Sequence, residues 1–366
     1  MSFWELPGPR RFSDQVVGDL RAGTTVVVVA PPNMPPLRRE LQLRIGADYA
    51  WRDIDVDDGC VDGATPLAVL SDVVGQRLAG VSALCESSHF GEYLFAVRGI
   101  DRARWQSWRP LLLEFVQAAR NAGGERPLML VEIDAGFDLD LAAEASLSTH
   151  IYRGVVDRLD CAVAASESAR DRGLDPLRHE LTVALAAEIA LFDPELASDL
   201  GNLRLDELAN SAALAGFLSE RPSCDEPAAW YNGTVDDVGG RPERSAVWLS
   251  RNGCHEEIER RIWRAQLGVI LPLVERDRLE IARRFSRSIS LPFVRGDGTE
   301  VERLEDFEIG DLKRAIDRIG RAAPPSIGPY VKTLFDCRNF LAHQECVPTE
   351  KLTALVEGRR ASRSAP

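Results

Sequence analysis

The sequence has 366 residues, enough for two or three domains, and its 45% hydrophobic and 28% charged residues are ordinary for globular proteins. The apolar run at residues 26–30 is far too short to cross a bilayer, and the first nine residues lack the pattern of a signal peptide. We therefore expect no membrane partner and a cytoplasmic location.

Charge is distributed unevenly along the chain. Residues 251–366 carry 21 basic and 18 acidic residues, a net charge of +3, so the first 250 residues hold a net charge of −16 within the total of −13. The C-terminal part tolerates a polyanion better than the N-terminal part does. Seven scattered cysteines without a CxxC pair argue against disulfides and zinc, so we expect reduced thiols and no metal.

The N-terminal half alternates between strand-like and helix-like segments, which predicts an α/β domain with a mostly parallel sheet. A continuous β-branched run, residues 24–30, reads as a strand buried on both faces. The other predicted strands are residues 49–56, 92–97, 128–133 and 161–165. The predicted helices are residues 12–20, 37–45, 65–78, 102–122, 177–191 and 194–200.

The loop after the first strand is where a phosphate-binding loop would lie, but it lacks the required residues. It contains Pro31, Pro32, Pro35 and Pro36, which have no N–H to donate, and no lysine precedes Lys313. Residues 128–134, LMLVEID, resemble a Walker B strand, with Asp138 and Asp140 adding carboxylates nearby. With a phosphate-binding loop these acids would hold Mg²⁺; without one they are the acidic end of a strand.

The order of strands followed by helices over residues 1–222 resembles the lid-bearing domain of AAA or STAND ATPases, in a degenerate P-loop form. That resemblance implies a sensor, a scaffold or a docking surface. An unrelated doubly wound domain, or one that binds a nucleotide through arginines, remains an alternative. We expect no cofactor.

Residues 223–249 are rich in proline, glycine and aspartate and are predicted to form a linker. A long arginine-rich helix, residues 255–285, follows, with a break or kink expected near Pro272. Its arginines either line an RNA path or form a solvated face. The run at residues 254–257, CHEE, matches no metal-binding spacing and favours a helix start.

The segment Ser326 to His343 is predicted to be an amphipathic helix, with Arg338 on its apolar stripe and His343 at its end. A histidine titrates near neutrality and can move the proton of a ribose 2′-OH, while an arginine forks onto phosphate oxygens. Asn339 would orient the histidine or hold a phosphate oxygen. The alternative is structural: His343 complements the helix dipole and Arg338 pairs with a carboxylate.

The run at residues 338–343, RNFLAH, resembles the signature of the HEPN superfamily, and a long first helix and the helix opening at residues 308–312 resemble it too. The resemblance covers roughly residues 254–358. It implies a helical bundle over residues 250–358 and a homodimeric, metal-independent endoribonuclease. Arg338, Asn339 and His343 would be its catalytic residues. The tail, residues 359–366, is expected to be disordered.

The family recurs in toxin–antitoxin and antiviral defence systems, so the resemblance also implies RNA as a substrate and a protein partner of such a system. Some members keep the helices without catalysis. The second hypothesis is therefore a non-catalytic adaptor, built from a pseudo-ATPase domain and an inactive bundle. A third is a domain that senses nucleotides or second messengers.

Overall fold

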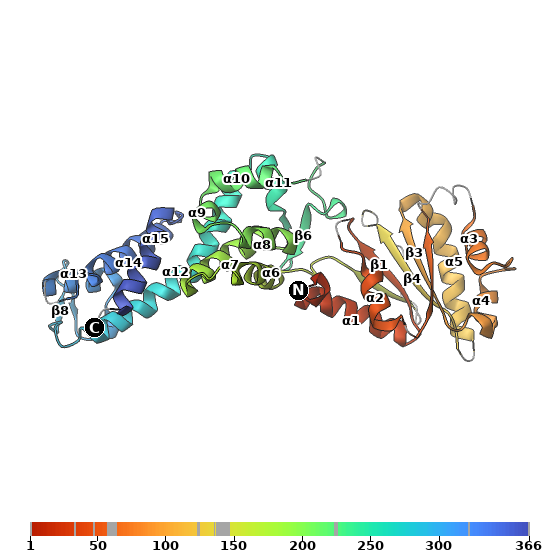
Figure 1. Ribbon diagram of the computed structural model, residues 1–366, viewed down its shortest axis with the longest axis horizontal. Coiled ribbons are helices and arrows are strands. Elements are labelled where there is room, and N and C mark those ends of the chain that lie inside the picture. The colour runs from red at the N-terminus through yellow and green to blue at the C-terminus, as the bar shows by residue number, and fades with distance from the viewer. Residues whose placement is uncertain are drawn as a thin grey trace. The chain divides into compact units, whose positions relative to one another are not determined.

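The computed structural model describes residues 2–32, 34–46, 48–56, 64–122, 125–134, 136, 147–222, 226–320 and 323–364. Its contacts divide the chain into two compact units (Figure 1). The first unit, the sheet unit, comprises Met1–Asp160 and Ser223–Ser245, and the second, the helical unit, comprises Cys161–Pro222 and Ala246–Pro366. Residues 161–222 thus belong with the C-terminal helices, whereas the sequence analysis grouped them with the sheet.

The sheet unit is built on a five-stranded sheet in the order β2-β3-β4-β1-β5. All of its pairings are parallel, as the strand and helix alternation predicted. Strand β1 lies between β4 and β5, so that Val27 lies opposite Val131 on one side and Thr149 on the other. The strands are β1 Thr25–Ala30, β2 Ala50–Asp55, β3 Tyr93–Ile100, β4 Leu128–Asp134 and β5 Leu147–Ile151.

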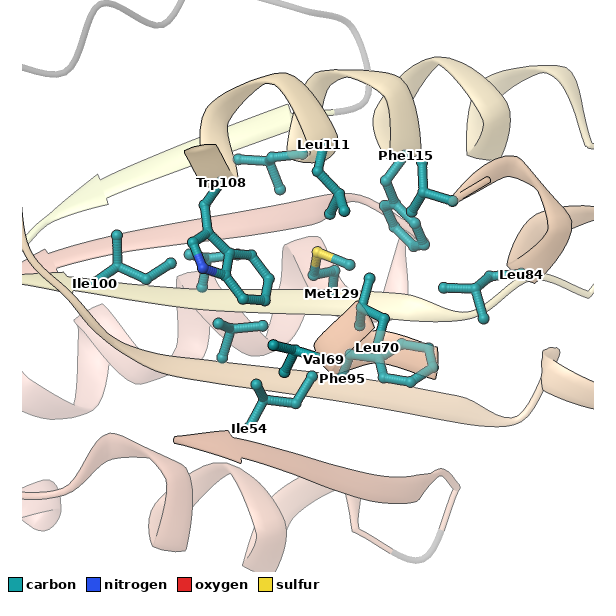
Figure 2. Close-up of a cluster of buried hydrophobic side chains, with 14 of the residues drawn as sticks. Ile54, Val69, Leu70, Leu84, Phe95, Ile100, Trp108, Leu111, Phe115 and Met129 are labelled. Carbon is teal, nitrogen blue, oxygen red and sulfur yellow. The ribbon is translucent and has the colours of Figure 1, made fainter. Parts of the chain in front are cut away.

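The main core of the sheet unit lies between one face of the sheet and α3, α4 and α5, as Figure 2 shows. Trp108, Leu111 and Phe115 of α5 pack there against strand residues such as Phe95 and Met129. Helices α1 and α2 cover the opposite face, which leaves every residue of β1 buried. The helices are α1 Pro7–Arg21, α2 Leu37–Ile45, α3 Pro66–Val74, α4 Ser82–Glu86 and α5 Arg102–Asn121.

In the middle of the chain one prediction is wrong and one strand was not predicted. Residues 161–165 lie in a helix, α6 Arg158–Arg170, not in a strand. Their small side chains suit close helix packing: a Cβ added at Gly201 of α8 would come within 2.7 Å of the carbonyl oxygen of Ala165. The fifth strand is instead β5, which is short and partly exposed and was not predicted.

The expected linker contains regular structure. Strands β6 Val235–Val238 and β7 Arg241–Arg244 form an antiparallel hairpin, turned by Gly239 and Gly240 with φ of 60° and 77°. Asp236 fixes the hairpin within the sheet unit by accepting from the backbone N–H of Gly154 at 2.8 Å. Burial raises the pKa of Asp236 to about 6. Residues 223–225 lie outside the described residues.

The helical unit is dominated by α12 His255–Arg284, a 30-residue helix that continues through Pro272 instead of breaking there. The remaining helices of this unit are α7 Pro176–Ala190, α8 Pro194–Gly201, α9 Leu205–Leu208, α10 Ser211–Ser219, α11 Ala246–Arg251, α13 Ile309–Ile319, α14 Ile327–Ala342 and α15 Thr349–Ser364. A short hairpin of β8 Phe293–Val294 and β9 Glu300–Val301 lies between α12 and α13.

The expected disordered tail is helical as far as Ser364, because α15 is held along its length. Arg359 pairs with the buried carboxylate of Asp277 at 3.0 Å, and the carbonyl oxygen of Ser362 accepts from Arg284 at 3.1 Å. Residues 365 and 366 lie outside the described residues. Across the described parts of the chain, every helix is too short or too polar for a bilayer crossing.

Candidate functional site

Helix α14 carries the candidate residues and packs through one apolar stripe. The buried members of that stripe include Tyr330, Val331, Leu334 and Leu341. The sequence analysis placed Arg338 on this stripe, but the structure places Cys337 there and leaves Arg338 exposed. The two positions are one residue apart, or 100° around the helix, and the small thiol fits the packed interior better than a guanidinium does. Burial raises the pKa of Cys337 to about 12, so this thiol is inert.

Arg338 and Asn339 interact with each other. Nη1 of Arg338 donates to the side-chain oxygen of Asn339 at 3.4 Å, a long and weak bond. No carboxylate of the described residues lies within ion-pair distance of Arg338. Its guanidinium is therefore available to an external anion.

His343 lies immediately after α14, and its imidazole is exposed. Its backbone N–H donates to the carbonyl oxygens of Asn339 and Phe340, both at 3.1 Å. Within the described part of the chain the ring itself makes no hydrogen bond, so Asn339 does not orient it here. The ring is free to accept a proton from a bound molecule.

The turn after His343 is tightly defined. Gln344 adopts a left-handed conformation, with φ of 61°, and the N–H of Glu345 returns to the carbonyl of Phe340 at 2.9 Å. This is the Schellman arrangement that ends many helices, here with a glutamine instead of the usual glycine. The histidine consequently sits on a fixed helix end.

Helix α12 supports this turn through two side chains, the half-buried Trp263 and the buried Gln266. The indole N–H of Trp263 donates to the carbonyl of Leu341 at 3.1 Å. Gln266, which is fully buried, accepts from the N–H of Val347 at 2.7 Å and donates to its carbonyl at 3.2 Å. The residues on either side of His343 are therefore both tied to α12.

A pocket of about 590 Å³ lies beside this turn and is acidic. Its wall includes the carboxylates of Glu256, Glu259 and Glu345, with Arg260 as its one basic residue. Arg260 is itself paired with Glu257 at 2.9 Å. A phosphate would be repelled from this side of the helix end, so its binding depends on Arg338.

Two arginines of α12, Arg261 and Arg264, are engaged within the helical unit and are not available to line an RNA path. Arg261 is completely buried and donates to the carbonyl of Ile189 at 3.0 Å. Arg264 bridges Glu188 and Glu257, at 3.4 and 2.9 Å. These charges hold α12 against its neighbours, which makes them structural.

The run at residues 254–257 starts a helix, as predicted. Cys254 is the N-cap residue of α12, and Glu256 and Glu257 lie in the first turn, where acidic residues complement the helix dipole. Within the described ranges, no three histidine, cysteine or acidic side chains come close enough to hold a metal ion.

The carboxyl edge of the sheet is the other candidate region. Arg38, in the first turn of α2, pairs with Asp53, and Arg98 pairs with Asp55 at 2.7 Å. Burial raises the pKa of Glu132 to about 7, an effect that the nearby charges of Arg98 and Arg38 reduce. The proline-rich loop leads directly into α2, whose N-cap is Pro36. Asp138 and Asp140 lie outside the described residues.

One further cluster combines the residue types of a hydrolase. Nε2 of His150 lies 2.8 Å from Asp19 and 3.2 Å from the hydroxyl of Ser148. A relay needs the acid and the nucleophile on opposite nitrogens of the ring, whereas here both contact the same nitrogen. The cluster therefore fastens β5 to α1 and has no catalytic geometry.

Comparison of the chain with known proteins found no matching family model and no matching curated protein. The functional argument therefore depends on the residues and their geometry.

Proposed function

We propose that the chain is a metal-independent endoribonuclease of the HEPN type, with its site at the exposed end of α14. The observation that carries the proposal is the state of Arg338. The structural alternative required a carboxylate partner for this guanidinium, and among the described residues its partner is the neutral amide of Asn339. Other arginines of this unit, such as Arg264, Arg278 and Arg295, are in ion pairs.

The proposed chemistry uses these side chains without a metal. His343 accepts the proton of a ribose 2′-OH, and the 2′-oxygen attacks the adjacent phosphorus. Arg338 stabilises the negative charge that develops on the phosphoryl oxygens. The bond to the 5′-oxygen breaks, and a protonated histidine supplies the proton to that leaving oxygen. The products are a 2′,3′-cyclic phosphate and a 5′-OH.

A homodimer suits this chemistry better than a single copy. At the end of α14, one copy offers one imidazole, that of His343, and one guanidinium without a carboxylate partner among the described residues, that of Arg338, next to a pocket with three glutamates. Two helix ends brought together supply one imidazole as base, a second as acid, and two guanidinium groups for the phosphate. The resemblance to the HEPN superfamily supports the same arrangement and a role in antiviral defence or a toxin system.

The sheet unit is proposed to regulate the nuclease. The loop after β1 is rich in proline, and the first arginine of α2 is engaged by Asp53. These features support a degenerate P-loop-like domain that serves as a sensor or docking surface instead of hydrolysing a nucleotide.

The test is incubation of the purified protein with labelled total RNA and transfer RNA in EDTA. His343→Ala is expected to reduce the rate by about 10²–10⁴-fold, as for the loss of a general acid or base. Lys332→Ala removes an exposed cation from the same helix and is the matched control, expected to cut like the wild type. A folded His343→Ala protein that cuts at the wild-type rate would refute the mechanism.

The second candidate is a non-catalytic adaptor, and the acidic pocket beside the helix end favours it. In that case no sample produces cyclic-phosphate ends, with or without the control substitution. Measurement of the molecular mass of the wild type in solution would then show assembly with a partner, while added RNA stays uncleaved.

A further inference from the structure

A second pocket of the helical unit, of about 430 Å³, is distinct from the proposed nuclease site. Three arginines line it from three separate segments: Arg172 after α6, Arg178 in the first turn of α7, and Arg204 before α9. Thr349 and Thr353, in the first turns of α15, add two hydroxyl groups. Thr349 and Thr353 are one helical turn apart on α15, but only the fold brings them together with the three arginines.

Two of the three guanidinium groups retain an uncompensated charge. Arg172 donates to the carbonyl oxygens of Gly201 and Leu203, at 2.9 and 2.6 Å, which orients the group without neutralising it. Arg178 makes no ion pair with any described residue. Arg204 is paired with Asp206 at 2.7 Å, so it contributes less.

The guanidinium of Arg178 contains a polar atom without a hydrogen-bond acceptor among the described residues. Its Nε is buried from solvent and has no hydrogen-bond acceptor among the described residues. A buried N–H without an acceptor costs about 1–3 kcal/mol, and native structures contain few of them. An anion in the pocket would accept from the outer Nη groups of the same guanidinium, which make no hydrogen bond with a described residue and are not buried as Nε is. A guanidinium presents these N–H groups as a fork that matches phosphate oxygens.

The remaining walls indicate the kind of anion. The pocket volume is within the range of small-molecule sites, roughly 300–1,000 Å³. The N-terminal end of α15 favours negative charge there. Leu174 and Leu205 give the pocket an apolar wall, while Glu350 and Asp206 limit its net positive charge. One compact anionic group attached to a flat apolar body fits these features better than a long polyanion does.

We propose that this pocket binds a small phosphorylated molecule of the size of a nucleoside monophosphate. Its phosphate would accept from Arg178 and from the hydroxyls of Thr349 and Thr353, with Arg172 nearby. Its ring would pack on Leu174 and Leu205. This inference stands apart from the nuclease proposal, since none of these residues belongs to the end of α14.

Calorimetric titration of the full chain with AMP, GMP, CMP and UMP tests the proposal. At least one of them is expected to bind, and its unphosphorylated nucleoside is expected not to bind. Arg178→Gln should weaken binding by about 10–100-fold, as for the loss of a hydrogen bond to a charged group. Arg287→Gln, at an exposed position of the same unit and outside the pocket, is the matched control and should bind like the wild type.

Thr353→Glu serves as a second variant in case Arg178→Gln does not fold. Thr353 is exposed, so a glutamate there is tolerated by the fold while repelling an anion from the pocket. Absence of binding for all four mononucleotides at millimolar concentration overturns the proposal. So does wild-type affinity in folded Arg178→Gln and Thr353→Glu. Binding of an RNA oligonucleotide that depends on Arg178, without binding of any mononucleotide, would assign the pocket to an RNA strand instead.

Discussion

The carboxyl edge of the sheet and the end of α14 both carry arginine side chains, which are paired with carboxylates in the first region and with no described carboxylate in the second. At the sheet edge, Arg38 and Arg98 are each paired with an aspartate of β2. At the end of α14, Arg338 has only a long contact to Asn339, and the His343 ring makes no hydrogen bond with a described residue. An arginine already satisfied by a carboxylate has little to gain from a phosphate. We therefore propose a structural role for the arginines of the first region and a chemical role for the side chains of the second.

After His343→Ala, the largest expected effect is that of Arg338→Ala on the rate of RNA cleavage. Removal of a donor to the developing charge is expected to lower the rate by about 10²–10³-fold. Because the side chain is exposed and unpaired with any described carboxylate, the free energy of unfolding should change by less than about 0.5 kcal/mol. Cleavage assays and urea unfolding of the same preparation check both parts. A stability loss well above that limit would mean that Arg338 is structural.

Glu132→Gln tests whether the negative charge of Glu132 at the sheet edge destabilises the folded protein. The pKa of Glu132 is about 7 in the folded protein against an ordinary value of 4.5, so the fold prefers the protonated form. Stability from this group is greatest below about pH 4.5 and is lost as the pH rises through 7. At pH 8 the glutamine variant should be more stable, by up to about 3 kcal/mol.

Urea unfolding at pH 5 and pH 8 measures this difference. The gain of Glu132→Gln over the wild type should be much smaller at pH 5, where the wild-type carboxyl is already protonated in the folded state. Glu92→Gln, at an exposed position, is the control and should change little at either pH. An equal gain at both values would show that the charge of Glu132 is not the cause.

Gln266→Leu tests whether cleavage depends on the hydrogen bonds that hold the turn after α14. The substitution leaves the N–H and carbonyl of Val347 without their buried partner, which should cost about 1–3 kcal/mol of unfolding free energy. Because the turn carries His343, cleavage should also fall, by less than for Arg338→Ala. Hydrogen exchange at the Val347 amide reads the loosening directly. Unchanged protection there would contradict the role given to Gln266.

The smallest effect is expected from Arg38→Ala. The pair with Asp53 is partly exposed, and such pairs contribute about 0–1 kcal/mol. Cleavage should be unchanged, measured with the same RNA. A large loss of cleavage would instead make the sheet edge part of the functional site.

Local sequence patterns predicted the elements whose signal is strong within a few residues. The β-branched run is β1, which is fully buried, and the helix expected to open at residues 308–312 is α13. Local sequence patterns did not predict the secondary structure where the same residue types are compatible with both a helix and a strand. Small apolar residues at 161–165 serve a helix that packs closely as well as a strand. The sequence LSTHI of β5 is too polar and short to read as a strand without its neighbour β1.

The sequence nominates the candidate site residues, and their function stays a prediction, but it does not predict their exposure. Arg338 and His343 can be picked out by residue type and spacing. Whether Cys337 or Arg338 faces the interior depends on the orientation of the helix about its axis, because neighbouring residues differ by about 100°. The arginine pocket had no signal at all, because Arg172, Arg204 and Thr349 are distant in sequence. Only tertiary contacts place such residues together.

The sheet unit is assembled from two separate stretches of chain, and this has a consequence for biosynthesis. Its hairpin, β6 and β7, emerges from the ribosome only after the helices of residues 161–222 have been made. Asp236, which binds the N–H of Gly154, is therefore absent while the five strands first meet. The sheet unit is therefore complete only once residue 245 has been made, and an expression fragment that ends at residue 160 or 222 would lack the hairpin.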